Sequence, residues 1–260
     1  MIKLIKIIML LLFIPVLGFA QEVKINKLDD QGRKTGIWKK YYENGKLLYE
    51  GNFHQGKPIG KLKRYYNGGV LKAEMNFCPD GINSYVKLYY ENRFLAAEGK
   101  YVRQLKDSTW NYYSFYNKRL TIKESYVKGK KNGLSIKYYD DGTVAEKMLW
   151  VNDVMQGEWE QFYENGQLRL KCYNVEGVRD GEFSSFNRDG TKSIHGNYIM
   201  GTMDGLWEYY KEGNIVDVKV EYVDGKMLPN AELEKRQKEF SKMIEESIGK
   251  YPEPNISNFR

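Results

Sequence analysis

GEWEQFYENGQLRLKCY, residues 157–173, is the stretch that decides the fold. It opens on Gly157, alternates aromatic and polar residues, turns at Asn165-Gly166 and then alternates again. Asn-Gly between two alternating runs is the strongest short-range signal for a β-hairpin, because both central residues of a type I′ turn need positive φ. The stretch therefore predicts a hairpin closed by a type I′ turn.

The same pattern recurs about eight times along the chain. Most units carry a bulky apolar third residue such as Trp38 and then an aromatic pair such as Tyr41-Tyr42, whereas the fifth unit has Ser135 as its third residue. Returning strands alternate with a period of two, which indicates one buried and one wet face. We therefore predict an all-β fold, an elongated antiparallel sheet of about eight consecutive 24-residue hairpins. The units open at Gly36, Gly60, Ser84, Ser108, Gly133, Gly157, Gly181 and Gly205.

The chain divides into four segments: a leader (1–20), the repeat array (21–227), a helix (228–250) and a polar tail (251–260). Lys3 and Lys6 precede a short apolar core, and small residues stand before a cleavage site at Ala20-Gln21. This pattern predicts a secretory signal peptide and an exported protein, periplasmic or extracellular. The alternative is an uncleaved anchor, but the apolar core is too short to span ~30 Å of hydrocarbon.

The segment after Pro229 changes from strand to helix periodicity. Asn230 can cap a helix, and apolar residues from Leu233 through Phe240 to Ile248 recur at helical spacing. We predict one amphipathic helix over residues 230–248. Its apolar stripe is expected to cover the open edge of the last strand rather than to enter a membrane.

Reactive side chains are sparse and far apart in such an array. His54 and His195, the only histidines, would stand ~58 Å apart, and Cys78 and Cys172 would stand ~38 Å apart, at ~4.8 Å per strand. No metal spacing, nucleophile elbow or phosphate loop is present. We therefore predict a non-enzyme with no catalytic residues, no metal site, no cofactor and no disulfide. Basic and acidic residues are interleaved, so no nucleic-acid partner is expected.

The repeat resembles the MORN-repeat variant family, whose units read glycine, aromatic, Tyr-Tyr-x-Asn-Gly and then leucine. Residues 36–47 and 157–168 carry this resemblance most closely, and it covers about residues 32–227. The resemblance implies an elongated sheet of successive hairpins. Bacterial members are often described as antitoxin or immunity components, and related repeats serve in membrane attachment and scaffolding.

Two functions from different classes follow. The first is an exported scaffold that binds an unknown protein partner, such as a toxin or effector, as an antitoxin or immunity component. The second is attachment to a lipid or glycan surface of the envelope. The first aromatic of each pair should face away from the buried tryptophans, which makes Tyr41, Tyr65, Tyr89 and Phe162 the candidate partner-binding residues.

Overall fold

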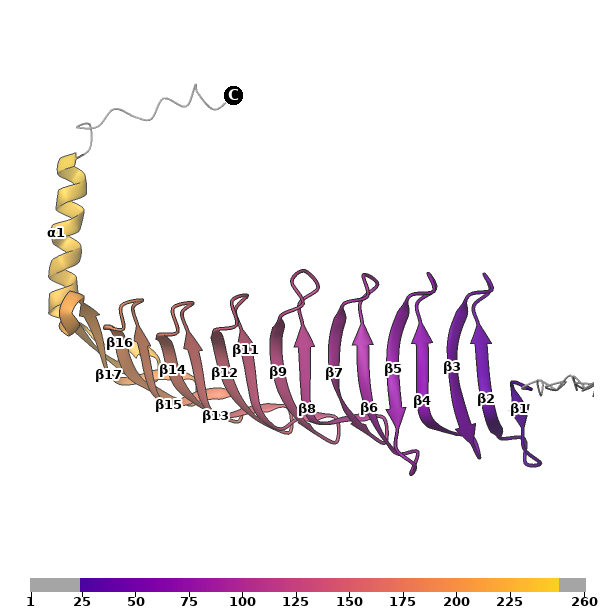
Figure 1. Cartoon of the computed structure of the whole chain (residues 1–260). Helices are drawn as coiled ribbons and strands as arrows, with labels where there is room; N and C mark the ends of the chain where they lie inside the picture. The colour runs from indigo at the N-terminus through magenta and orange to yellow at the C-terminus, as the bar shows by residue number, and fades with distance from the viewer. Residues whose placement is uncertain (1–23, 248–260) are drawn as a thin grey trace, which may run out of the picture.

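The structure, a computed structural model, describes residues 24–247. Nineteen strands form one open antiparallel sheet that follows the chain order, and one helix ends the array (Figure 1). The all-β prediction and its eight hairpins are confirmed. The predicted signal peptide and the polar tail lie outside the described residues.

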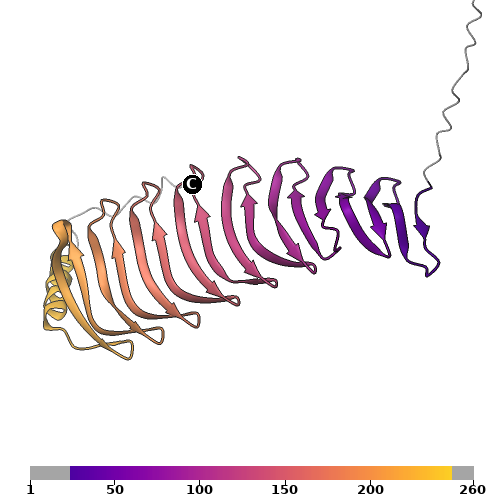
Figure 2. The ribbon, with the colours of Figure 1, turned by 60° about the horizontal axis from the view of Figure 1, so that its bottom comes forward.

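Eight antiparallel hairpins, called units 1–8, make up the array. They are β2–β3 (Lys34–Tyr41, Leu47–His54), β4–β5 (Lys57–Tyr65, Leu71–Phe77), β6–β7 (Asn83–Tyr89, Leu95–Val102), β8–β9 (Leu105–Tyr113, Leu120–Val127), β11–β12 (Gly133–Tyr138, Val144–Val151), β13–β14 (Val154–Phe162, Leu168–Val175), β15–β16 (Val178–Phe186, Lys192–Ile199) and β17–β18 (Thr202–Lys211, Ile215–Val223). Short strands β1 (Lys27–Leu28), β10 (Lys130–Lys131) and β19 (Lys226–Met227) and a 3-10 turn, η1 (Glu212–Asn214), complete the sheet region. Its strands bend in a common direction (Figure 2).

The hairpin turns differ from the predicted type. At the Asn44-Gly45 turn of the first unit only the glycine has positive φ, at 79°, and its N–H donates to the Tyr42 carbonyl. The Asn44 side chain instead accepts a hydrogen bond from the Lys46 N–H and donates to Asn67 in the next unit. The type I′ prediction was wrong: the asparagine contributes side-chain hydrogen bonds to the turn, and only the glycine adopts the left-handed region.

Type I′ geometry occurs at the opposite ends of the strands, in the turns that connect one unit to the next. Two successive residues have positive φ at Gln55-Gly56, at Glu176-Gly177 and at Met200-Gly201. These two-residue connections join one hairpin to the next and match the twist of the flanking strands. The units are joined by Gly-x-x-x-Gly segments such as residues 56–60. Only the first glycine of such a segment belongs to the turn, and the residues after it begin the next strand.

The two faces of the sheet have different chemistry. One, which we call the aromatic face, carries a row of residues that pair or pack strand to strand and includes Trp38, Leu62, Val86, Trp110, Trp159, Phe183 and Trp207. The other, which we call the ladder face, carries alternating lysine and glutamate, with ion pairs at Lys39–Glu50, Lys61–Glu74, Lys147–Glu160 and Lys219–Glu208. A single sheet thus folds by packing its aromatic side chains against one another along the array.

The aromatic face holds two apolar clusters separated by a polar segment. Trp110 centres one cluster with Val86, and Trp207 centres the other with Phe183. Between them lie Glu124, Ser135 and Glu146, all buried. Burial disfavours the charged form of both glutamates, but Lys131 and Tyr126 beside Glu124, and Lys137, Gln161 and Trp159 beside Glu146, hold each pKa below its ordinary value.

The helix α1 (Ala231–Ser247) confirms the predicted element and corrects its placement. It projects from the end of the sheet (Figure 1). Arg236 pairs with Asp217 of β18 at 2.8 Å, but the side chains of Phe240 and Met243 remain 58% and 57% exposed. The prediction that the apolar stripe covers the strand edge was wrong: residues 226–230 pair with that edge instead, through β19 and the Asn230 amide, which donates to the Lys219 carbonyl.

Candidate functional site

The four predicted contact residues lie on the ladder face. Tyr41 is 49% exposed, the Tyr65 hydroxyl donates to Glu50 at 2.9 Å, and Lys147 lies over the Phe162 ring at 4.9 Å. Tyr89 lies two residues after Lys87 on β6 and shares the ladder face with it. Tyr41, Tyr65 and Tyr89 belong to neighbouring hairpins, whereas Phe162 lies three units farther along.

The row has members that the sequence prediction omitted, namely Tyr113, Tyr138, Phe186 and Tyr210. In the fourth unit Tyr113 occupies the position, because it lies five residues after the unit opening and its hydroxyl donates to Glu98. Counting from the opening residue would have found it. Burial and the Glu50 hydrogen bond raise the pKa of Tyr65 to about 12, and burial with Glu98 does the same for Tyr113. Tyr65 and Tyr113 thus stay neutral and hold ladder-face glutamates by hydrogen bonds.

In five units the tyrosine that follows the ladder-face row links neighbouring units. The Tyr42 hydroxyl donates to the Tyr65 carbonyl at 2.8 Å, and the Tyr163 hydroxyl donates to the Phe186 carbonyl at 2.8 Å. In each case the acceptor lies 23 residues later in the chain. The aromatic pair is therefore largely structural, with one hydroxyl directed to the next unit and one ring on the ladder face.

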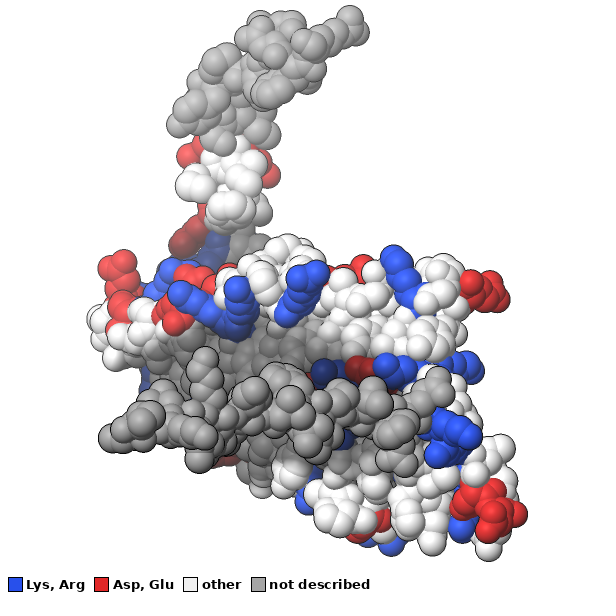
Figure 3. All heavy atoms as spheres, turned by 45° about the vertical axis from the view of Figure 1, so that its right-hand side comes forward, with Lys and Arg blue, Asp and Glu red and all other residues white. Residues whose placement is uncertain are grey.

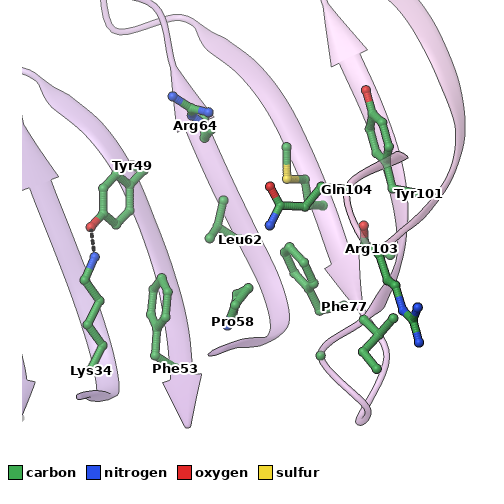
Figure 4. A pocket seen from close by; sticks show the side chains of 14 residues that line it. Lys34, Tyr49, Phe53, Pro58, Leu62, Arg64, Phe77, Tyr101, Arg103 and Gln104 are labelled. Carbon is green, nitrogen blue, oxygen red and sulfur yellow. Dashed lines mark hydrogen bonds between the residues drawn. The ribbon is translucent and has the colours of Figure 1, made fainter. Parts of the chain in front are cut away.

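A hollow of the described surface lies on the aromatic face of units 1–3. This groove has a volume of about 730 Å³ (Figure 4). Phe53, Leu62, Met75 and Phe77 contribute apolar lining, and Phe53 and Leu62 are the most buried of these. The groove crosses the strands from Lys34 at one end to the Arg103 turn at the other (Figure 4). Sequence reasoning missed it because it placed the contact residues on the opposite face.

At this place the repeat carries a proline where four other units carry a lysine or arginine and three carry an isoleucine or methionine. In unit 7, Arg179 packs over Trp159, Phe183 and Tyr198 at 5.3–5.8 Å from the ring centroids. The equivalent residue in the strand pairing of unit 2 is Pro58. Proline is too short to lie across the aromatic row, so the space that a long cation fills elsewhere stays open.

Charges around the groove have one sign. Lys34, Arg64 and Arg103 line it, and no Asp or Glu does. Lys34 donates to the Tyr49 hydroxyl at 2.7 Å and lies over Trp38, so its charge is partly committed. Within residues 24–247, neither Arg64 nor Arg103 has an ion-pair partner, and both are exposed. Over the face visible in Figure 3, by contrast, basic and acidic side chains are interspersed.

A serine, a histidine and a glutamate meet on the ladder face of unit 7. His195 Nδ1 lies 3.1 Å from Ser184 Oγ and 3.7 Å from Glu182 Oε1. A nucleophilic relay needs the serine and the carboxylate on opposite ring nitrogens, and here both approach the same one. The arrangement therefore provides no relay. Among residues 24–247, no three His, Cys, Asp or Glu side chains gather as a metal site, and no helix is long and apolar enough to span a bilayer.

Comparison with known proteins identifies the repeat. The family model described as MORN repeat variant matches residues 34–55, 58–78, 131–152 and 155–173. No curated protein matches the chain. The matched segments coincide with units 1, 2, 5 and 6, and the other four hairpins repeat the antiparallel pairing of these. Four of the eight hairpins are therefore similar in sequence to the MORN repeat variant.

Proposed function

We propose that the protein is a non-enzymatic scaffold that binds a protein partner through the groove of units 1–3. The observation that carries this proposal is the combination of an apolar floor with two unpaired guanidinium groups and no acidic lining. Arginine and large apolar side chains in a concave site dominate the energetics of protein interfaces. The groove fits a partner segment that places an apolar side chain beside a carboxylate.

The proposal extends to export and to an antitoxin or immunity role, in which the partner is a toxin or effector. Export is supported by the leader pattern of residues 1–20, with its two lysines, short apolar core and small residues before Gln21. The immunity role is supported by the resemblance of the repeats. A scaffold that blocks an effector needs a rigid, preformed contact surface, and a hydrogen-bonded array with linked hairpins supplies one.

A cross-linking pull-down from native envelope extract tests the scaffold proposal. The full chain is compared with the double variant Arg64→Glu/Arg103→Glu and with Lys123→Glu/Arg169→Glu, which makes the same charge change on the ladder face. We expect a protein partner to be enriched by the wild type and the control and at least about tenfold less by the groove variant. Equal enrichment by all three chains, or enrichment by none, would contradict the proposal.

A second candidate is attachment to a lipid or glycan surface. The exposed Phe240 and Met243 of α1 favour it, as amphipathic helices can lie in a membrane interface. Co-sedimentation with neutral and anionic vesicles and with envelope glycan, using the chain with and without residues 229–260, tests this function. Binding that disappears with the helix would support lipid attachment, and binding to neither ligand class would remove the candidate.

A further inference from the structure

The helix α1 has an apolar stripe with one acidic border. At about 100° per residue, Phe240, Met243 and Leu233 share one side of the helix, with Arg236 between them. Glu239 and Glu246 lie along one border of this stripe, where Lys235 and Lys242 lie 3.9 Å from them, and the opposite side of the helix is polar. Phe240 and Met243 are more than half exposed, so the stripe presents apolar surface that another protein surface can bury.

The groove of units 1–3 is complementary to that stripe in charge, polarity and length. Its floor is apolar, its unpaired cations are Arg64 and Arg103, and its lining contains no carboxylate. From β2 to β7 it extends on the order of 24 Å at about 4.8 Å per strand. The 17 residues of α1 extend about 25 Å at 1.5 Å per residue. An amphipathic helix laid in an apolar groove is a recurring mode of protein recognition.

The helix cannot reach the groove of its own chain. Asn230 is bonded to the Lys219 carbonyl and Arg236 is paired with Asp217, so α1 is tied to β18. Strands β8–β17 stand between β18 and the near end of the groove at β7, which places them on the order of 50 Å apart. A groove that receives this helix must belong to another molecule.

We propose that α1 of one copy of this protein docks in the groove of a second copy. The proposal rests on the proposed function in taking the groove as a protein-docking site, and it names a second copy as an occupant. Phe240 and Met243 lie over Phe53 and Phe77, and the border glutamates pair with Arg64 and Arg103. The contact joins two different surfaces, so it builds a head-to-tail assembly or, where two copies exchange helices, a dimer.

Sedimentation velocity over a range of concentrations tests the assembly. The full chain is expressed with residues 1–20 present, so that any processing takes place as in the cell. We expect the wild type and the control Lys123→Glu/Arg169→Glu to associate, and two variants to remain monomeric: Arg64→Glu/Arg103→Glu, and Phe240→Ser/Met243→Ser. Circular dichroism confirms that each variant is folded. A wild type that stays monomeric, or association unchanged in both variants, would overturn the inference.

A peptide-binding experiment with exchanged charges tests the same contact independently. A labelled peptide of residues 229–247 should bind the full chain in fluorescence anisotropy and lose at least about tenfold in affinity for Arg64→Glu/Arg103→Glu. A peptide in which Glu239 and Glu246 are replaced by lysine should show the opposite preference. Failure of both peptides to bind overturns the inference, whereas loss of an envelope partner from the groove variant would still support the proposed function.

Discussion

Units 1–3 and units 6–8 share one hairpin register and differ in what fills the aromatic face. In units 6–8, Arg179 packs over three aromatic rings, and Phe183 and Trp207 are almost wholly buried. In units 1–3 the residues equivalent to Arg179 are Lys34, Pro58 and Ile82, and a groove remains. The repeat backbone is thus constant, while the side chains on the aromatic face decide whether that face is closed or open.

The largest expected effect comes from filling the glycine under Trp207. A Cβ on Gly196 would lie 2.2–2.7 Å from atoms of the Trp207 ring, and the backbone there does not have positive φ, so the penalty is steric. We expect Gly196→Ala to lower the free energy of unfolding by about 3 kcal/mol. Urea unfolding followed by circular dichroism measures it.

The matched change in the open region is Gly51→Ala. There the added Cβ meets Leu62 side-chain atoms at 3.0–3.2 Å, and Leu62 borders the groove. Because this side chain can shift into open space, we expect a loss of about 1 kcal/mol or less. Equal losses in the two variants would show that the open face is packed as tightly as the closed one.

Acid should act on the polar segment between the two regions. The pKa values of Glu124 and Glu146 are lowered in the folded state despite burial, because Lys131 and Lys137 stabilise the carboxylates. A lowered folded-state pKa contributes stability that is fully present above the unfolded-state value of about 4.3 and is lost as the pH falls through the folded-state value. We expect the free energy of unfolding to decrease below about pH 5.

Glu146→Gln isolates this contribution. It should cost about 2 kcal/mol near pH 7, because it replaces a charge-assisted bond to Lys137 and weakens those from Trp159 and Gln161, and it should flatten the acid limb. Glu158→Gln, an exposed ladder-face change, is the control and should keep the limb. An acid limb of wild-type slope in Glu146→Gln would contradict the assignment. Denaturant titrations from pH 3 to pH 7 supply the measurement.

Exchanging the residues that open and close the face tests the comparison directly. Pro58→Lys should place an ammonium group over Phe77, which is equivalent to the Tyr198 ring beside Arg179, and close the groove, with a change in stability within about 1 kcal/mol. Arg179→Ala should open a second groove and cost about 1.5 kcal/mol through lost ring contacts. Binding of the labelled 229–247 peptide should fall in the first variant and rise in the second. If Pro58→Lys binds the peptide as the wild type does, Pro58 does not control the groove.

Much of this fold could be predicted from the sequence because its signals are local and repeated. The unit openings, the alternating strands and the terminal helix depend on residue order within one hairpin, and the structure confirms them. The turn type could not be predicted from Asn44-Gly45 alone, since the asparagine is selected by a bond to Asn67 in the next unit. The placement of α1 likewise depends on Arg236 meeting Asp217, which are distant in sequence.

The groove could have been predicted only in part. Position 58 carries proline where Lys34, Lys106, Lys131 and Arg179 stand in other units, but Ile82, Met155 and Met203 also replace the cation, so the sequence signal is partial. The groove itself could not be predicted, because it depends on which face position 58 occupies and on how far a cation extends over neighbouring rings. The sequence prediction chose the ladder-face tyrosines instead. The hydrogen bond from the Tyr65 hydroxyl to Glu50 shows a structural role that composition does not reveal.

A further small effect concerns the hydroxyl links at the hairpin tips. Tyr66 donates to the Tyr89 carbonyl in the open region, and Tyr163 donates to the Phe186 carbonyl in the closed one, both at 2.8 Å. We expect Tyr66→Phe and Tyr163→Phe each to cost about 1 kcal/mol in urea unfolding, with Tyr41→Phe as a control that changes little, since its ring is half exposed. Equal losses would place the difference between the regions on the aromatic face alone, because the tips would then link the units identically. A loss at Tyr66 that exceeds the loss at Tyr163 by more than about 0.5 kcal/mol would instead show that the open groove depends on the tips to hold its width.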